Sequence, residues 1–319
     1  MVATRGCTQI LTAWERVYRF LRDAFPAAHY HQGRTLAAVA QDARAVTATF
    51  ADGSKVEADL LVGADGIRSP VRQLLLPDLA PGYAGYVAWR ALLAEQDFPS
   101  QLREEIFPFM SFGLPPGEQF LGYPVAGPDN DLRAGRRRYN VIWYRPADEH
   151  TTLIDLLTDS NGVAHDNSIP PPLIRKQAID DMRDAAERFL GWQFRDIVRL
   201  IDEPILQPIC DLESPRMAFG RIAIVGDAAF VARPHVAAGV TKAADDAAAL
   251  AQALAHADNV EAGLKNFEAG QVAVNRRIIQ RARHLGAYLQ ASQTADERAN
   301  SARHGIPEAV LAETALPGT

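Results

Sequence analysis

Residues 221–242 have the sequence RIAIVGDAAFVARPHVAAGVTK. The apolar start of this stretch predicts a short strand that ends in Gly226 and Asp227. A long Ala-rich helix is predicted from about Val240, because apolar residues recur there at helical spacing directly after Gly239. The free N–H groups at the start of that helix suit an anionic ring edge or a phosphate, and Asp227 suits a sugar or ribityl hydroxyl. The alternative is a corner between strand and helix that binds no ligand.

A second strand–turn–helix motif occupies residues 59–72, with the sequence DLLVGADGIRSPVR. Gly63 and Gly66 allow the backbone to approach a ligand closely, because neither carries a Cβ. Asp65 places a hydrogen-bond acceptor at the turn, and Ser69 is a candidate N-cap for the following helix. Open α/β sheets bind ligands at such turns, at the carboxyl ends of their strands. An ordinary βα turn is the alternative.

The segment before these motifs predicts one helix and two strands. A capping-box pattern at residues 12–15 and an apolar stripe predict a helix that stops at Pro26. Two strands are predicted at residues 46–50 and 56–62, with an Asp-Gly hairpin turn between them. The second of these strands is apolar enough to lie in a sheet that is buried on both faces.

Aromatic residues crowd into residues 82–145 and predict a mostly antiparallel sheet. In the strand predicted at residues 139–144, odd-numbered side chains share one face and even-numbered side chains share the other. A second strand is predicted at residues 120–125. Helices are predicted within residues 151–205 and over residues 262–289, whereas the polar, Ala-rich end of the chain shows no strong pattern.

The resulting order is α/β, then a β-rich insert, then α/β again. We therefore predict the first part of a cofactor domain over residues 1–80, a substrate lobe over residues 81–205, the second part of the cofactor domain over residues 206–290, and a tail over residues 291–319. Two unrelated domains with a helical linker would give the same order.

The composition of the 319 residues excludes several classes of protein. The net charge of −6 and pI of about 5.8 argue against nucleic-acid and membrane-surface binding, which usually need a basic face. The one basic run, residues 136–138, predicts a solvated hairpin loop, with a polyanion site as the alternative. Two distant cysteines, Cys7 and Cys210, make a disulfide or a zinc site improbable. With no membrane-length apolar run and no signal-peptide pattern, we expect a cytoplasmic protein.

Together, the two motifs resemble the Asp-Gly and Gly-Asp fingerprints of the class A flavoprotein monooxygenases, the para-hydroxybenzoate hydroxylase superfamily. Asp65 and Asp227 are 162 residues apart, since 227 − 65 = 162, which leaves room for a substrate lobe between them. Three stretches also resemble the 2,6-dihydroxypyridine 3-hydroxylase branch of that superfamily: YAGYVAWR at 83–90, YPVAG at 123–127 and ARPHVAAG at 232–239. The resemblance extends from about residue 8 to about residue 289.

This resemblance implies an α/β fold in which a Rossmann-like FAD/NAD(P)-binding domain is interrupted by a mostly antiparallel substrate lobe. It implies FAD as cofactor and NADH or NADPH as co-substrate. The first motif would meet the dinucleotide part of FAD, Asp227 its ribityl and pyrophosphate, and the following loop its isoalloxazine ring. The implied cofactor contacts are Gln9, Asp65, Gly66, Arg68, Asp227, Pro234, Gly239, Val240 and Thr241.

The implied reaction is hydroxylation of an electron-rich ring, a hydroxypyridine or a phenol, by O2 through a flavin C4a-hydroperoxide. A base that ionises the ring hydroxyl would help, and His235 is the candidate, with a hydrogen-bonded loop histidine as the alternative. Arg233 would hold an anionic substrate or flavin edge, or else form a structural ion pair. Members of the superfamily are commonly homodimers.

One family feature is missing from the sequence. No Gly-x-Gly-x-x-Gly motif stands near the N-terminus, where it would cradle the ADP pyrophosphate. Three explanations are open: a longer natural protein, a unit supplied by another chain, or a fragment that has lost FAD and activity. A reductase or halogenase of the same fold is a further alternative, although the Trp-x-Trp-x-Ile halogenase signature is absent.

Overall fold

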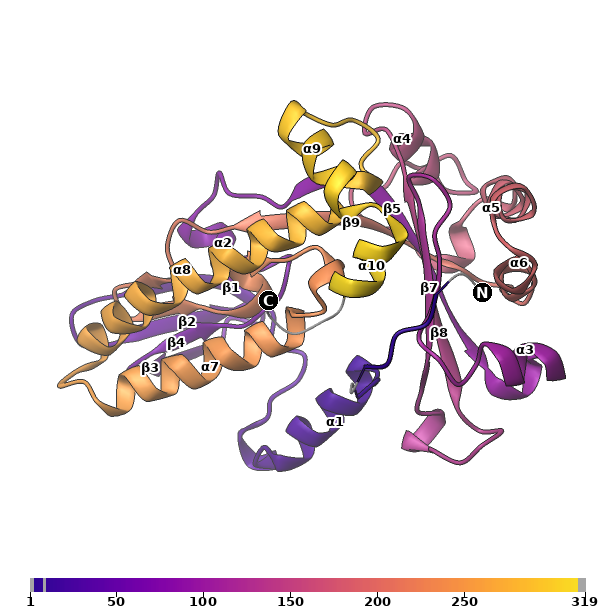
Figure 1. Ribbon diagram of the computed structural model, residues 1–319. Coiled ribbons are helices and arrows are strands. Elements are labelled where there is room, and N and C mark those ends of the chain that lie inside the picture. The colour runs from indigo at the N-terminus through magenta and orange to yellow at the C-terminus, as the bar shows by residue number, and fades with distance from the viewer. Residues whose placement is uncertain (1–2, 8–9, 315–319) are drawn as a thin grey trace. The chain divides into compact units, whose positions relative to one another are not determined.

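The computed structural model describes residues 3–7 and 10–314, which form two compact units (Figure 1). Unit 1 comprises the segment that ends at His29, Tyr83–Ile209 and Ala287–Ala312. Unit 2 comprises Tyr30–Gly82, Cys210–Gly286 and the segment that begins at Glu313. Unit 1 thus interrupts unit 2 twice in the sequence, at Tyr83–Ile209 and at Ala287–Ala312, and it also includes the segment before Tyr30.

Unit 2 contains two small sheets with helices packed beside them. The antiparallel sheet has the order β1-β2-β3, and the other has the order β10-β11-β4, in which β11 and β4 run parallel. Helices α7 and α8 lie side by side (Figure 1). The bounds are β1 Leu36–Gln41, β2 Val46–Phe50, β3 Lys55–Ala58, β4 Leu61–Gly63, β10 Ala218–Phe219, β11 Ile222–Ile224, β12 Phe230–Val231, α2 Pro70–Leu75, α7 Gly239–Ala255 and α8 Val260–Gly286.

The core of unit 2 forms where α7 and α8 meet the parallel strands. Ile222 and Ile224 of β11 are almost fully buried, together with Leu250 of α7 and Phe267 and Ile279 of α8. Burial of each such side chain stabilises the fold by about 1.5–3 kcal/mol. This packing fixes the carboxyl end of β11 against the start of α7.

Unit 1 is built on the predicted antiparallel sheet, in the order β9-β5-β8-β7-β6. The alternation predicted for residues 139–144 is confirmed, because Tyr139, Val141 and Trp143 join one buried cluster while Ile142 and Tyr144 join another. The strand bounds are β5 Gly82–Ala94, β6 Ser111–Gly113, β7 Gln119–Val125, β8 Arg138–Pro146 and β9 Ile205–Glu213.

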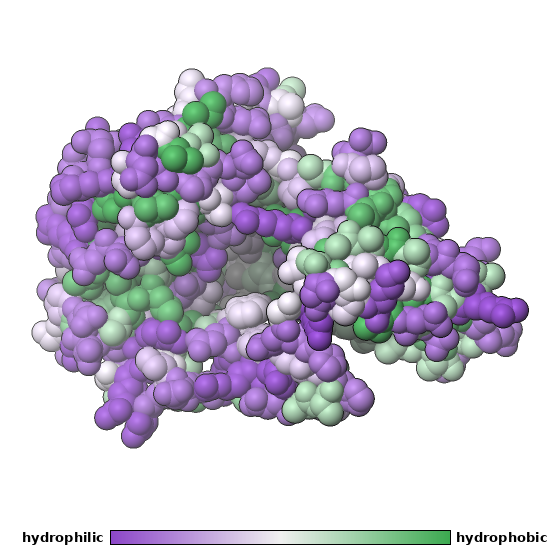
Figure 2. All heavy atoms as spheres, turned by 180° about the vertical axis from the view of Figure 1, so that it is seen from behind, coloured by the Kyte–Doolittle hydropathy of each residue, from purple (hydrophilic) through white to green (hydrophobic). Residues whose placement is uncertain are grey.

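The remaining helices are short. They are α1 Trp14–Ala24, α3 Ser100–Glu105, α4 Thr152–Leu156, α5 Lys176–Phe189, α6 Trp192–Arg199, α9 Ala295–His304 and α10 Pro307–Glu313. No helix in the described part of the chain has the length and apolar character that crossing a membrane requires. Hydrophobic residues do reach the surface, as Figure 2 shows for one face, and α1 buries none of its residues.

Three expectations about secondary structure are wrong. The predicted capping box at residues 12–15 does not form, because α1 begins after an N-cap at Ala13. The strand predicted at residues 56–62 is two strands, because β3 pairs with β2 whereas β4 leaves that sheet to pair with β11. The end of the chain, expected to be a tail without a pattern, forms α9 and α10, and a capping box of Thr294 and Glu297 opens α9.

Candidate cofactor site

The two sequence motifs lie at neighbouring strand ends in unit 2. Strands β4 and β11 pair in parallel, with Gly63 opposite Ile224, and the N–H of Val225 donates to the Gly63 carbonyl at 3.0 Å. The turn that contains Asp65 therefore follows one strand, and the turn that contains Asp227 follows its neighbour. The carboxyl ends of adjacent parallel strands are the usual ligand edge of an α/β sheet.

The Asp-Gly turn is held by the helix that follows it. The Asp65 carboxylate accepts a hydrogen bond from the Val71 N–H at 3.0 Å, and the Ser69 hydroxyl caps α2 by accepting from the Arg72 N–H at 2.9 Å. Gly66 has a φ of +77°, a left-handed conformation that favours glycine. Open space lies where a Cβ of Gly66 would point, and Arg68 next to the turn is exposed.

Arg72 joins the two turns, a role that no sequence pattern indicates. Its guanidinium donates to the carbonyl of Ile67 at 2.6 Å and to the carbonyl of Ala228, next to Asp227, at 3.1 Å. The residue is only 1% exposed, and burial lowers the pKa of Arg72 although the nearby Asp65 raises it. A buried arginine has five donors in a rigid fork, so it can fix two backbone segments at once.

The Gly-Asp turn is fixed by a buried polar group on the helices behind it. Gly226 has a φ of +60°, and its N–H donates to Asp246 of α7 at 2.9 Å. Asp246 also accepts from the side-chain amide of Asn275 of α8 at 2.8 Å and lies 3.5 Å from the Lys242 ammonium. All three side chains are buried, so hydrogen bonds to buried groups fix the left-handed conformation of Gly226.

Asp227 at the end of this turn is exposed, unlike its neighbours Gly226 and Ala228. Protein atoms still crowd its carboxyl group, and this crowding and the Asp246 charge raise the pKa of Asp227, whereas Lys242 lowers it. Because the Asp227 side chain also contacts solvent, the rise in its pKa is limited. An exposed carboxylate on a rigid turn is suited to accept hydrogen bonds from hydroxyl groups of a bound molecule.

Helix α7 begins with three exposed residues, Gly239, Val240 and Thr241. Among the described residues, no side chain caps this 17-residue helix, whose N-cap is Ala238. The first N–H groups of a helix lack partners within it, and its N-terminus carries a partial positive charge. Nothing lies within 4 Å of where a Cβ of Gly239 would be, so an anionic group has open access.

These features fit FAD. The sequence-predicted residues at this edge of unit 2 lie on the two turns or at the start of α7, and they are exposed or partly exposed, as is Pro234: Asp65, Gly66, Arg68, Asp227, Gly239, Val240 and Thr241. They offer a carboxylate for sugar hydroxyls and unpartnered N–H groups for phosphate or the flavin edge. Gln9 lies outside the described residues.

Arg233 and His235 lie in the loop between these features, and both are buried. Arg233 pairs with Asp211 at 2.8 Å, and Asp211 also accepts from Arg283 at 2.8 Å. Burial opposes ionisation of Asp211, but the two arginines outweigh it and lower its pKa. Burial, with a smaller effect of Arg233, lowers the pKa of His235 to about 3, so the imidazole is neutral at physiological pH. The geometry favours the structural alternatives for both residues, and their catalytic roles remain predictions.

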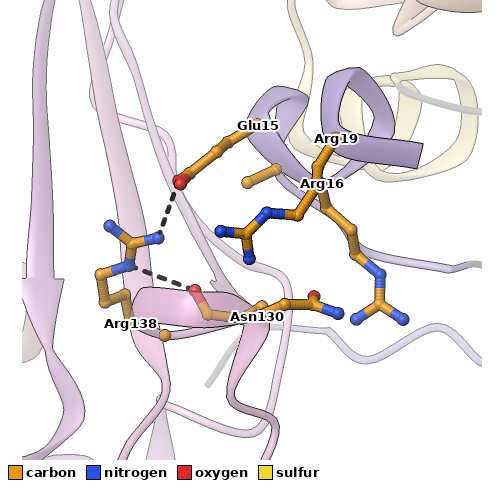
Figure 3. A pocket seen from close by; sticks show the side chains of 8 residues that line it. Glu15, Arg16, Arg19, Asn130 and Arg138 are labelled. Atoms are coloured by element: carbon orange, nitrogen blue, oxygen red, sulfur yellow. Dashed lines mark hydrogen bonds and ion pairs between the residues drawn. The ribbon is translucent and has the colours of Figure 1, made fainter. Parts of the chain in front are cut away.

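The basic run at residues 136–138 lies in unit 1, where its side chains meet carboxylates. Arg137 pairs with the buried Glu95 at 2.7 Å, and Arg138 pairs with Glu15 of α1 at 3.2 Å (Figure 3). Arg138 also donates to the Ala126 carbonyl at 3.1 Å. The hydrogen bonds from Arg137 lower the pKa of Glu95 although burial opposes this. These contacts give the run a structural role within unit 1.

Two family models match the chain in succession. The model described as FAD binding domain-like matches residues 83–211, and the model described as FAD binding domain matches residues 212–282. The chain is 30% identical over 306 residues to 2,6-dihydroxypyridine 3-monooxygenase of Paenarthrobacter nicotinovorans, covering 93% of this chain and 74% of that protein. The chain belongs to the class A FAD-dependent aromatic hydroxylases.

A solved structure and a second relative agree with this assignment. The structure of 2,6-dihydroxypyridine-3-hydroxylase from Arthrobacter nicotinovorans superposes with a TM-score of 0.81 at 30% identity, covering 88% of this chain and 70% of that one. 6-Hydroxynicotinate 3-monooxygenase of Pseudomonas fluorescens is 26% identical over 290 residues, covering 86% of this chain and 65% of that enzyme. The predicted family, its FAD cofactor and the mixed α/β fold with an antiparallel sheet are therefore confirmed.

Proposed function

We propose that this chain hydroxylates a hydroxypyridine or a related phenol, with FAD as cofactor and NADH or NADPH as reductant. The overall change would be ring C–H + O2 + NAD(P)H + H⁺ → ring C–OH + H2O + NAD(P)⁺. One observation carries the proposal. Arg72 binds the backbone of both fingerprint turns, and the turns lie beside the start of α7, which has no side-chain cap. The similarity to enzymes named for dihydroxypyridine and hydroxynicotinate favours a hydroxylated pyridine.

The residues would divide the work of holding the cofactor. Asp227 would accept hydrogen bonds from ribityl hydroxyls, and the N–H groups of Gly239, Val240 and Thr241 would stabilise negative charge at the flavin edge. Asp65, Gly66 and Arg68 would meet the dinucleotide part of FAD and the nicotinamide nucleotide. When bound, FAD supplies the redox chemistry by accepting a hydride from NAD(P)H and activating O2.

His235, while buried, does not explain how the ring hydroxyl of the substrate loses its proton. A group with a pKa of about 3 is a weak base, so it would take a proton from a ring hydroxyl poorly. We therefore propose that His235 stiffens the flavin loop from behind, beside Arg233 and its partner Asp211. The observation behind this assignment is the burial of both side chains, 2% exposed for His235 and 5% for Arg233.

Oxygen transfer tests the function directly. The chain, FAD and NADH or NADPH are incubated under ¹⁸O2 with 2,6-dihydroxypyridine, 6-hydroxynicotinate or a phenol. Mass spectrometry then measures the ¹⁸O content of the products. The proposal predicts one ¹⁸O atom in the product. Oxidation of NAD(P)H without labelled product would point to a reductase or to uncoupled oxidation. No flavin-dependent oxidation with any of these rings would favour the inactive-fragment alternative.

The predicted homodimer is a further part of the proposal, and light scattering of the purified chain measures it.

A further inference from the structure

Asp211 is a carboxylate that two arginines share. It lies on β9, and its side chain is 11% exposed. Its Oδ2 accepts a hydrogen bond from Nε of Arg233 at 2.8 Å, and its Oδ1 accepts two from the guanidinium of Arg283, at 2.8 and 3.2 Å. Hydrogen bonds between charged groups fix geometry as well as adding stability. Because both oxygens are used, the orientation of this carboxylate links the positions of the two arginines.

The two arginines belong to different parts of unit 2. Arg233 lies in the loop of residues 232–238, between β12 and α7, whereas Arg283 lies in the last turn of α8. Arg283 also donates to Glu213 at 3.4 Å. Asp211 and Glu213 are two residues apart on β9, so they share one face of the strand and hold Arg283 at two points. The carboxylate of Asp211 therefore ties the loop to the end of α8.

The loop needs such support because its backbone is strained. Ala237 has a φ of +49°, a left-handed conformation that is costly for a residue with a Cβ. Strained backbone persists only where the surrounding structure fixes it. The turn Pro234–Val236 lies against α8, and the loop ends at Ala238, the N-cap of α7. The position of the loop thus sets how the chain enters α7.

We propose that Arg283 is a positioning residue that holds the loop of residues 232–238 through Asp211 and Arg233, so that α7 presents its first N–H groups to the flavin edge. This inference rests on the proposed function. The first turn of α7, residues 239–241, is exposed, so the preceding loop has to fix it. Without Arg283, Oδ1 of Asp211 loses both of these hydrogen bonds, and the carboxylate can turn with respect to Arg233.

The experiment compares Arg283→Met with the wild-type chain, with Arg283→Lys and with Arg277→Met, the same substitution at an exposed position of α8. One arm measures hydrogen–deuterium exchange of the FAD-free chain by mass spectrometry. In Arg283→Met, the amides of residues 232–238 should exchange at least about tenfold faster, while those of the β1-β2-β3 sheet exchange at the wild-type rate. Arg283→Lys keeps a cation for Asp211 and should restore most of the protection, and Arg277→Met should behave as the wild type.

The second arm measures the affinity of each protein for FAD and the midpoint potential of the bound flavin. Reduced flavin carries negative charge, so it depends more than oxidised flavin on the N–H groups at the start of α7. Arg283→Met should bind reduced FAD about tenfold more weakly relative to oxidised FAD. This ratio corresponds to a fall of about 30 mV in the two-electron midpoint potential. Arg277→Met should leave the potential unchanged.

Wild-type exchange of residues 232–238 in Arg283→Met would overturn the inference. Faster exchange of equal size throughout unit 2 would also overturn it, because that is a general loss of stability, and so would an unchanged midpoint potential. If the wild-type chain binds no FAD, the proposed function fails, and the exchange arm alone decides whether Arg283 holds the loop. If circular dichroism shows that Arg283→Met does not fold, Arg283→Gln takes its place and is judged by the same outcomes.

Discussion

Replacement of Arg72 by Met should loosen both fingerprint turns at once. The change removes two hydrogen bonds from a charged donor, to Ile67 and to Ala228, each worth about 1.5–3 kcal/mol. It also removes a buried Nε that has no partner among the described residues, which regains about 1–3 kcal/mol. We therefore expect the free energy of unfolding to fall by about 2–4 kcal/mol.

Urea unfolding followed by far-ultraviolet circular dichroism measures this loss. With a denaturant slope near 2 kcal/mol per M, the midpoint should fall by about 1–2 M. The matched control is Arg44→Met, the same substitution at an exposed position of unit 2, which should change stability by less than about 0.5 kcal/mol. Equal midpoints for the two variants would refute the view that Arg72 holds the turns together.

Three further changes test separate parts of the site. Gly239→Ala should leave the FAD-free protein as stable as the wild type or slightly more stable, because the added Cβ meets nothing within 4 Å. The same methyl group should weaken FAD binding at least about tenfold, because it narrows the approach to the start of α7. An unchanged FAD affinity in calorimetric titration would remove Gly239 from the site. His235→Gln should make stability depend less on pH. The pKa of His235 is about 3 in the folded protein and 6.5 in the unfolded chain, so His235 makes the wild type about 2 kcal/mol less stable at pH 5 than at pH 7. If thermal unfolding shows the same change in stability with pH for the variant and the wild type, His235 is not buried as a neutral group. Asp211→Asn should cost about 3 kcal/mol in urea unfolding because it leaves the buried Arg233 without its carboxylate, and no loss would show that the ion pair is dispensable.

Local signals predicted much of the fold. Alternation along residues 139–144 is visible in the sequence because a strand has a period of two, and the two sets of side chains pack into separate buried clusters. The Asp52-Gly53 turn joins β2 and β3, with Gly53 at a φ of +81°. The Gly-Asp turn was also recognisable, because a glycine directly after an apolar strand favours a turn, and Gly226 has a φ of +60° there.

The features that could not be predicted depend on residues far away in the chain. The break between β3 and β4 follows from pairing with β11, some 160 residues later, and nothing in residues 56–62 indicates it. The role of Arg72 likewise depends on the carbonyl of Ala228, 156 residues away. Helix α9 is a different case, because its capping box at Thr294 and Glu297 was present in the sequence and went unrecognised.

The central claim is that FAD binds at the turn of Asp227 and the start of α7. Titration of the purified chain with FAD, followed by flavin absorbance near 450 nm and by calorimetry, tests it most directly. The account predicts binding of one FAD per chain and an affinity at least about tenfold weaker in Asp227→Ala, which loses charge-assisted hydrogen bonds worth about 1.5–3 kcal/mol. Equal FAD affinity in the wild type and Asp227→Ala, or no binding by either, would contradict it.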